Sequence, residues 1–233
     1  MAEVSTDPTE RITPRQFHEA DRVGDWRVLG EGACGYFRTG SFAAGARFVQ
    51  AIGELAGLDD HHPDVDVRQA GVTVRLITII PGFYGLTARD VELARRISTV
   101  ARELGLPADP SGLQNVQVTI DALVGADVLP FWRALLGYLD RGDGDQDLID
   151  PQGRGPLFWF QQMDAPRPQR NRMHIDVWVP YDRAEARVAA AVAAGGRLLT
   201  DEYAPAYWVL ADAEGNEACV GTAGWLGPEP GAR

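Results

Sequence analysis

Hydrophobic and polar positions in the first half of the chain switch repeatedly between a period of two and a period near 3.6. The first period is typical of strands that are buried on one face, and the second is typical of amphipathic helices. We predict, in order, a helix over 14–20, strands over 26–29 and 36–39 around a turn at 30–32, a helix over 41–57, a strand over 72–80 and a helix over 87–105. Mixed helices and strands in this order indicate an α+β domain.

Two of these helices carry clear start signals. Ser41 can cap the first, in which Phe48, Ile52 and Leu55 form an apolar stripe at spacings of four and three residues. Thr87 begins the second, and Asp90 follows it three residues later in the arrangement of a capping box. A charged loop that carries two histidines, residues 59–66, separates the first of these helices from the strand over 72–80.

The second half repeats a strand-helix-strand pattern after a segment rich in turn residues. Pro107, Pro110 and Gly112 fall within seven residues, so we interpret 106–112 as a linker. The predicted elements beyond it are a strand over 116–121, a helix over 126–138, strands near 148 and over 157–163 and 174–179, a helix from 182 to about 195, and strands over 197–200, 207–211 and 217–221. This order reads as a β-α-β-β-β module that occurs twice.

Composition excludes several kinds of chemistry. The 233 residues contain 22 basic side chains, all arginine, and 33 acidic ones, which gives a net charge of -11. Without lysine there can be no Schiff-base catalysis, no P-loop and no kinase-type ATP site. The negative charge argues against nucleic acid or an anionic membrane as a partner.

Cysteine usage and the terminal sequence indicate the compartment. Cys34 and Cys219 are the two cysteines, far apart and in no metal-knuckle spacing, as expected for reduced thiols. The first ten residues are polar and acidic, unlike a signal peptide, and no apolar run reaches the length of a membrane span. We therefore expect a cytoplasmic protein.

His61 and His62 are the most unusual local feature. Imidazole is the side chain best suited to proton transfer near neutral pH, and adjacent loop histidines can serve two different steps. The dipeptide alone is equally compatible with two solvated loop residues. The choice between these interpretations depends on the surrounding sequence.

That surrounding sequence resembles the pterin-4a-carbinolamine dehydratase family over about residues 12–106. The resemblance rests on Asp60-His61-His62-Pro63, on the strand that reaches Thr78, and on the helix start from Gly85 to Asp90. It implies an antiparallel sheet with helices on one face and assembly as a homodimer or higher homo-oligomer. It also implies a hydro-lyase that removes water from a 4a-hydroxytetrahydropterin, such as 4a-hydroxytetrahydrobiopterin, to give a quinonoid dihydropterin without a cofactor.

The resemblance also implies the residues of the site. His61, His62 and Asp90 match the catalytic positions, with the roles of acid and base left open between the histidines, and Pro63 and Thr78 are expected to contact the substrate. One position departs from the family, because Ile79 stands where a third catalytic histidine normally follows the strand threonine. Loss of one acid or base typically lowers a rate by about 100- to 10,000-fold.

Residues 113–227 resemble the vicinal oxygen chelate superfamily, which includes glyoxalase I, extradiol dioxygenases and bleomycin-resistance proteins. The marks of this resemblance are Phe131-Trp132, the segment Asn171 to Asp176, and the segment Asp212 to Glu217. The superfamily pairs two βαβββ modules into a cup that holds a small ligand.

The resemblance suggests the residues of this cup. We expect Trp159 and His174 to face the ligand, whose identity stays open. Four metal-ligand positions of the superfamily align with this segment: one of Gln114, Asn115 and Gln117, then Gln161 or Gln162, then His174, and last Cys219. This is a poor set for a hard metal, so we expect no metal, with His174 and Cys219 as the candidates for a soft one.

Two further functions therefore stand beside dehydration. The chain could be a small-molecule binding or sequestering protein of the bleomycin-resistance type, or a metal-dependent enzyme of the glyoxalase type.

Overall fold

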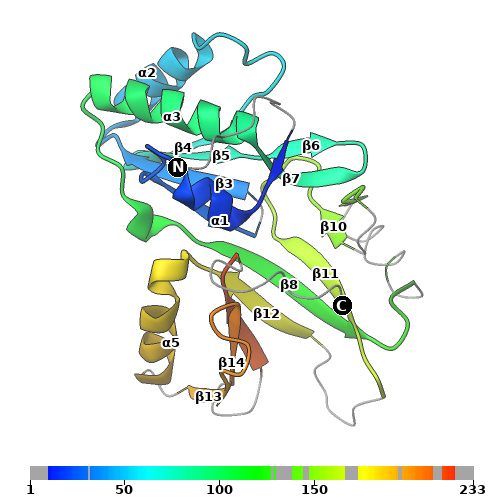
Figure 1. The fold of residues 1–233 in the computed structure, drawn as a ribbon. Coiled ribbons are helices and arrows are strands. Elements are labelled where there is room, and N and C mark those ends of the chain that lie inside the picture. The colour runs from blue at the N-terminus through cyan, green and yellow to red at the C-terminus, as the bar shows by residue number, and fades with distance from the viewer. Residues whose placement is uncertain are drawn as a thin grey trace. The chain divides into compact units, whose positions relative to one another are not determined.

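The computed structural model describes residues 10–30, 32–126, 129, 138–143, 147–165, 173–193, 196–211 and 217–223. Within these ranges the chain divides into two compact units, one formed by residues 10–80 and 84–113 and the other by residues 81–83 and the described residues from 114 onward (Figure 1). Both units combine helices with strands, so the predicted α+β class is confirmed. No helix in the described ranges is long and apolar enough to cross a membrane.

The first unit is built on a four-stranded antiparallel sheet in the order β2-β3-β5-β4. A smaller sheet has the order β1-β7-β6. The strands are β1 (Arg11–Ile12), β2 (Trp26–Leu29), β3 (Gly32–Arg38), β4 (Asp64–Val67), β5 (Gly71–Leu76), β6 (Thr78–Ile80) and β7 (Phe83–Thr87), and the helices are α1 (Pro14–Glu19), α2 (Phe42–Gly53), α3 (Ala88–Glu103) and the 3-10 turn η1 (Pro110–Gly112).

Helices α2 and α3 cover one face of the larger sheet (Figure 1). Phe48 of α2, Ile97 of α3 and Val74 of β5 are fully buried between them. Trp26 is also fully buried, and its indole N–H donates to the hydroxyl of Ser98, 2.9 Å away. Apolar area removed from water in this layer is the main source of the unit's stability.

The start signals predicted for these helices are confirmed. The Ser41 hydroxyl accepts from the backbone N–H of Ala44 at 3.2 Å, and Thr87 and Asp90 form the capping box of α3. Helix α2 ends at Gly53, four residues before the predicted end.

Two strand predictions and one loop prediction need correction. Strand β3 begins at Gly32 rather than at residue 36, because the missing side chain of Gly35 leaves room for the Trp26 ring, which would stand 3.2 Å from an added Cβ. The strand predicted over 72–80 is two strands, with a break at Ile77 where the chain passes from one sheet to the other. The loop expected over 59–66 ends earlier, because strand β4 begins at Asp64.

The segment interpreted as a linker, residues 106–112, is hydrogen-bonded to the first unit. The N–H of Arg38 donates to the carbonyl of Pro107 at 2.9 Å, and the N–H of Asp109 donates to the carbonyl of Tyr36 at 2.8 Å. Leu113 is buried with Leu29 and Cys34. The turn residues of this segment therefore end helix α3, but the segment itself stays hydrogen-bonded to the first unit.

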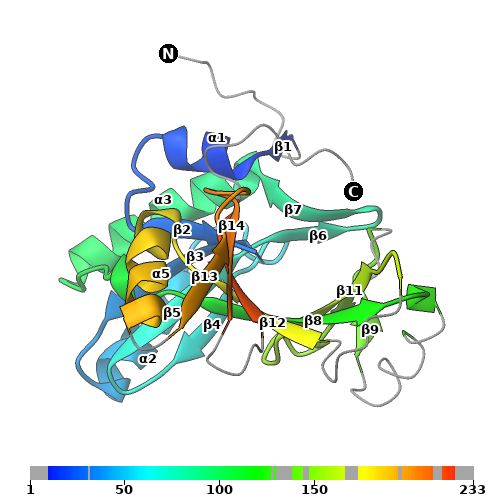
Figure 2. The ribbon, with the colours of Figure 1, turned by 90° about the horizontal axis from the view of Figure 1, so that it is seen from below.

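The second unit contains an eight-stranded sheet in the order β13-β14-β15-β12-β8-β11-β10-β9. Its elements are β8 (Asn115–Ala122), β9 (Leu139–Asp140), β10 (Asp147–Ile149), β11 (Leu157–Gln162), β12 (Met173–Trp178), the 3-10 turn η2 (Tyr181–Arg183), α5 (Ala184–Ala193), β13 (Arg197–Thr200), β14 (Tyr207–Ala211) and β15 (Glu217–Gly221). Figure 2 shows β8 between β11 and β12.

The two halves of this sheet repeat one another. Strand β8 pairs in parallel with β11 as β12 does with β15, and β8 and β12 meet antiparallel at the centre. This pairing agrees with the predicted doubled module. The helix predicted over 126–138 and the marks at Phe131-Trp132, Asn171-Arg172 and residues 212–216 lie outside the described residues.

Candidate functional site

Asp90 is the centre of a buried polar network at the start of α3. Its side chain is fully buried. Oδ2 accepts from the backbone N–H of Thr87 at 2.7 Å, from the hydroxyl of Thr78 at 2.8 Å and from the hydroxyl of Thr87 at 3.1 Å. The local sequence makes this possible, since a carboxylate three residues after the cap reaches back to the cap's N–H. Three donors and the N-terminus of α3 therefore surround one oxygen of this carboxyl group.

The second oxygen of Asp90 binds His61. The distance from Nε2 of His61 to Oδ1 is 2.9 Å, and the imidazole is 11% exposed. The two residues are 29 positions apart in sequence, so the contact depends on the fold. A histidine held by a carboxylate is fixed in orientation, and one edge of its ring stays available for proton transfer.

The other residues expected at this site differ in exposure. His62 is exposed on the same loop, and Pro63 is half-buried beside it. Thr78 is buried, and its hydroxyl also lies 2.9 Å from that of Thr87, so two protein partners engage it. Ile79, at the position of the family's third histidine, is 55% exposed.

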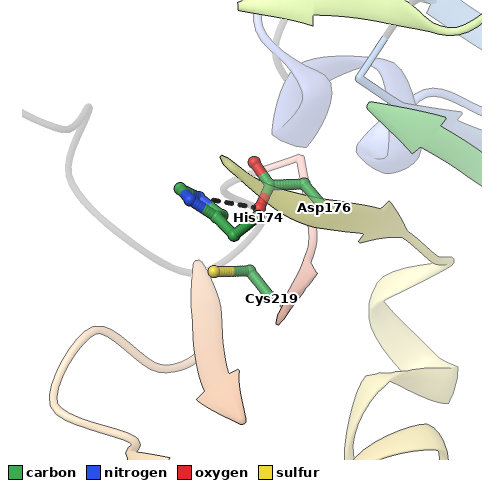
Figure 3. Close-up of side chains that lie close together, drawn as sticks. All are labelled: His174, Asp176 and Cys219. Carbon is green, nitrogen blue, oxygen red and sulfur yellow. Dashed lines mark ion pairs between the residues drawn. The ribbon is translucent and has the colours of Figure 1, made fainter. Parts of the chain in front are cut away.

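A second cluster lies on the central strands of the other unit. Ligand atoms of His174, Asp176 and Cys219 all fall within 4.8 Å of one another (Figure 3). His174 and Asp176 are on the same face of β12, and Cys219 lies opposite Asp176 on β15. Nε2 of His174 is 3.4 Å from Oδ1 of Asp176. Imidazole, carboxylate and thiol together suit a borderline-soft cation such as Zn²⁺.

Neighbouring polar groups hold this cluster. Oδ2 of Asp176 accepts from the hydroxyl of Thr119 at 2.9 Å and from the amide of Gln117 at 3.3 Å. Burial, followed by the negative charge of Asp176, raises the pKa of the Cys219 thiol far above its usual range. Cys219 therefore carries its proton until a cation or another positive group replaces it.

Among the amides considered as metal ligands, Gln117 lies next to the cluster. Gln114 accepts from Arg187 at 3.1 Å, Asn115 accepts from the N–H of Val116 at 2.9 Å, and Gln162 donates to the carbonyl of Met163 at 3.0 Å. The side-chain amides of these three residues therefore bond to partners outside the cluster. Trp159, expected on the cup wall, lies opposite Thr119 across the ladder, and His174 lies opposite the same Thr119 on the other side of β8.

Two acidic residues were missed by the sequence analysis. Asp176 joins the cluster, and Oδ1 of Asp121 lies 3.9 Å from Nδ1 of His174. A signal was present, because the triplets Thr119-Ile120-Asp121 and His174-Ile175-Asp176 occupy β8 and β12, the corresponding strands of the two modules. Each triplet places its first and third side chains on one face of a strand.

Comparison with known proteins places a match on each unit. Residues 10–100 match the family model described as pterin 4 alpha carbinolamine dehydratase, and residues 117–221 match the model described as a glyoxalase-like domain. A structure of a glyoxalase/bleomycin resistance protein/dioxygenase superfamily member from Vibrio splendidus 12B01 covers 47% of this chain and 99% of its own, with 12% identity and a TM-score of 0.30.

Three relatives, all provisionally named pterin-4-alpha-carbinolamine dehydratase, are similar to the first unit. The protein from Nocardia farcinica (strain IFM 10152) is 37% identical over 95 residues, which are 40% of this chain and 98% of the relative. The protein from Mycobacterium leprae (strain Br4923) is 35% identical over 75 residues, 32% of this chain and 78% of the relative. The protein from Mycobacterium avium (strain 104) is 42% identical over 60 residues, 26% of this chain and 62% of the relative.

Proposed function

Because the chain belongs, through residues 10–100, to the pterin-4-alpha-carbinolamine dehydratase family, we propose that its first unit dehydrates a 4a-hydroxytetrahydropterin. The products are water and the quinonoid dihydropterin. A base takes the proton from a ring nitrogen, the nitrogen's electron pair forms a new double bond to the ring, and the C4a–O bond breaks. An acid protonates the departing hydroxyl, so the proton removed and the proton supplied balance.

The observation that carries this proposal is the contact between His61 and the buried carboxylate of Asp90. It supplies an imidazole that a buried carboxyl group holds in one orientation. His62, exposed on the same loop, is the second imidazole of the mechanism. With Ile79 in place of a third histidine, these two side chains carry the proton transfers, and we expect a slower enzyme than one with three.

The direct test measures conversion of 4a-hydroxytetrahydropterin, generated in the assay, against the uncatalysed reaction in buffer. We expect acceleration by the wild-type chain, and losses of about 100- to 10,000-fold for His61→Ala and His62→Ala. His18→Gln is the matched control, because His18 accepts from the N–H of Val28 at 3.1 Å, away from the Asp90 network. Wild-type protein that gives only the buffer rate would contradict the proposal.

Restoring the third histidine gives a complementary test. We expect Ile79→His to raise kcat, by at most the factor that one general acid or base contributes, about 100- to 10,000-fold. The exposed position of Ile79 makes the substitution tolerable to the fold. Ile79→Gln is the control for added polarity, and it should leave kcat unchanged because a side-chain amide is neither an acid nor a base near neutral pH.

A second function is favoured for the other unit by the cluster of His174, Asp176 and Cys219. We propose that these three side chains hold a zinc-like divalent cation, which would act as a Lewis acid toward a small ligand. Metal binding should release the thiol proton of Cys219. This proposal is independent of dehydration, since its residues all lie in the second unit.

Zinc titration of the metal-free chain is the test. We expect one equivalent to bind with proton release, and Cys219→Ala to abolish that release, while Cys34→Ala leaves it unchanged because Cys34 is in the first unit. The absorption spectrum of the cobalt-loaded chain provides a second measurement, because a thiolate ligand gives a charge-transfer band. Of the two cysteine variants, Cys219→Ala should remove this band and Cys34→Ala should keep it. Binding without proton release would exclude Cys219 as a ligand.

A further inference from the structure

We propose that Asp121 is a positioning residue for the cation site of the second unit, and that it holds the imidazole of His174 with Nε2 directed at the metal ion. The inference rests on the proposed zinc site, whose ligands are His174, Asp176 and Cys219. It adds a carboxylate that contacts the edge of the imidazole facing away from the ion.

The duplicated sheet puts His174 between two carboxylates. Strands β8 and β12 run antiparallel, and Thr119 lies opposite His174. Each of these two residues is followed two positions later by an aspartate on the same face, Asp121 on β8 and Asp176 on β12. Because the strands run in opposite directions, the two aspartates lie on opposite sides of the central pair. Diagonal neighbours in a sheet are about 7–8 Å apart, within reach of an aromatic side chain.

The two nitrogens of the imidazole face these two carboxylates separately. Nε2 of His174 is 3.4 Å from Oδ1 of Asp176, and Nδ1 is 3.9 Å from Oδ1 of Asp121. The third ligand, Cys219, lies opposite Asp176 on β15, whereas Asp121 belongs to β8 on the other side of β12 (Figure 3). A cation that Asp176 and Cys219 both bind therefore meets Nε2, the ring nitrogen beside Asp176.

Burial makes the charge of Asp121 effective at this distance. The side chain of Asp121 is 7% exposed, and that of His174 is 14% exposed. Charges with little contact to water are screened much less than charges on the surface. A rotation of the ring or of the carboxylate that shortens the separation by about 1 Å brings Nδ1 and Oδ1 to hydrogen-bonding distance.

Metal coordination fixes what Nδ1 must do. A neutral imidazole that gives the lone pair of Nε2 to a cation carries its hydrogen on Nδ1. In the metal-bound chain this hydrogen points at the carboxylate of Asp121, which accepts it. Histidine ligands almost always donate their second ring hydrogen to such a partner, which orients the ring and makes the ligating nitrogen more basic. Asp121 is that partner for His174.

Asp121 falls outside the set of ligands itself. In the part of the chain that the structure describes, the ligand atoms that all lie within 4.8 Å of one another come from His174, Asp176 and Cys219. Three protein ligands leave one position of a tetrahedral ion open for a small ligand. Asp121 therefore acts on the ion through His174 and leaves that position open.

The test compares the zinc affinity of full-length variants, measured by competition with a chromophoric chelator. We expect Asp121→Asn to weaken zinc binding about 10- to 100-fold, the usual loss when the outer partner of a metal-bound histidine is replaced. The thiolate band of the cobalt-loaded variant should persist, because Cys219 stays a ligand. Asp121→Glu keeps the carboxylate and should lose less affinity than Asp121→Asn.

Glu217→Gln is the matched control for the loss of charge alone. Burial is the main cause of the raised pKa of the Cys219 thiol, and the charge of Asp176 is the next. Glu217 follows, ahead of Asp121, so the thiol senses Glu217 more strongly than Asp121. Glu217 is exposed on β15, and we expect its replacement to change zinc affinity by no more than about fivefold, the scale of an exposed charge.

Nitrogen NMR of the zinc-loaded wild-type chain measures the ring orientation without any variant. A metal-bound ring nitrogen and one that carries hydrogen differ in chemical shift, so the spectrum identifies the atom of His174 that holds the ion. We expect zinc on Nε2 and hydrogen on Nδ1. Zinc on Nδ1 would overturn the inference, and so would an Asp121→Asn chain that loses no more affinity than Glu217→Gln.

The positioning role and the zinc site can be rejected separately. A wild-type chain that binds no zinc rejects both. A wild-type chain that binds zinc with a thiolate ligand, beside an Asp121→Asn chain that binds it equally well, rejects the positioning role alone.

Discussion

Replacing Asp90 by asparagine should damage both the fold of the first unit and its chemistry. The substitution keeps the size of the side chain and removes its charge. The amide oxygen can still accept from Thr87 and Thr78, but the amide nitrogen then faces Nε2 of His61, 2.9 Å away in the wild type. An amide nitrogen can only donate, so Nε2 of His61 keeps this contact only as an acceptor, with the ring hydrogen on Nδ1, and otherwise the ring turns away.

The stability cost follows from the four bonds that Asp90 accepts. Bonds to a charged group contribute about 1.5–3 kcal/mol each, and neutral ones about 0.5–1.5 kcal/mol. Three bonds weakened by about 1–1.5 kcal/mol each and one lost bond of about 1.5–3 kcal/mol give about 4.5–7.5 kcal/mol. For a domain of this size, 1 kcal/mol shifts Tm by about 4–8 °C, so we expect one calorimetric transition to fall by about 20 °C or more. The transition of the second unit should not move, because these contacts all lie in the first unit.

Activity gives the second measurement. Without the carboxylate that holds His61, dehydration should fall by about 100- to 10,000-fold at a temperature where the variant is folded. Asp59→Asn is the matched control, since it removes an exposed carboxylate just before the histidine pair. A variant that keeps its Tm within about 3 °C would refute the stabilising role of the four bonds to Asp90. A variant that keeps its full kcat would refute the role of Asp90 in dehydration.

Three further predictions concern the rest of the chain. Native Cys219 should react with iodoacetamide far more slowly than in urea, because burial raises the pKa of its thiol; equal rates would contradict this. Gly71→Ala should be strongly destabilising in urea denaturation, since its Cβ would stand 2.5 Å from an aromatic carbon, whereas Gly53→Ala meets nothing within 4 Å and should stabilise α2 by about 0.5–1 kcal/mol. The pKa of the Asp109 carboxyl is lowered, mainly by the Ser111 hydroxyl. Asp109→Asn should therefore be less stable than wild type above about pH 4, and the difference in the free energy of unfolding should vanish as the pH falls through the folded pKa.

Most elements of both units follow from periodicity and caps, because these signals are local. The strands over 197–200, 207–211 and 217–221 have the observed bounds, and the capping box at Thr87 is present as predicted. Strand β7 was missed, since its sequence, Phe83 to Thr87, contains a glycine and alternates weakly. Its pairing with β1 places Thr87 opposite Arg11, a contact that no local pattern encodes.

The site was predictable to a different extent in each unit. His61, His62 and Asp90 came from a family motif, and the motif gave neither the 2.9 Å contact between His61 and Asp90 nor the bond from Thr78 to Asp90, which depend on the fold. In the second unit, Asp176 was missed because the superfamily resemblance places one metal ligand on each strand. His174 and Asp176 can both serve as ligands because residues two apart on a strand share a face. Many pairs in the sequence have this spacing, so it does not identify this pair.

The backbone amide of Thr87 provides a built-in reporter of the first site. It donates to the same oxygen of Asp90 that holds the threonine hydroxyls, and Thr87 is fully buried. Its hydrogen can exchange with solvent only when the first turn of α3 opens. Exchange at this one amide therefore measures how often the Thr87 N–H separates from Oδ2 of Asp90, the carboxylate whose other oxygen contacts His61.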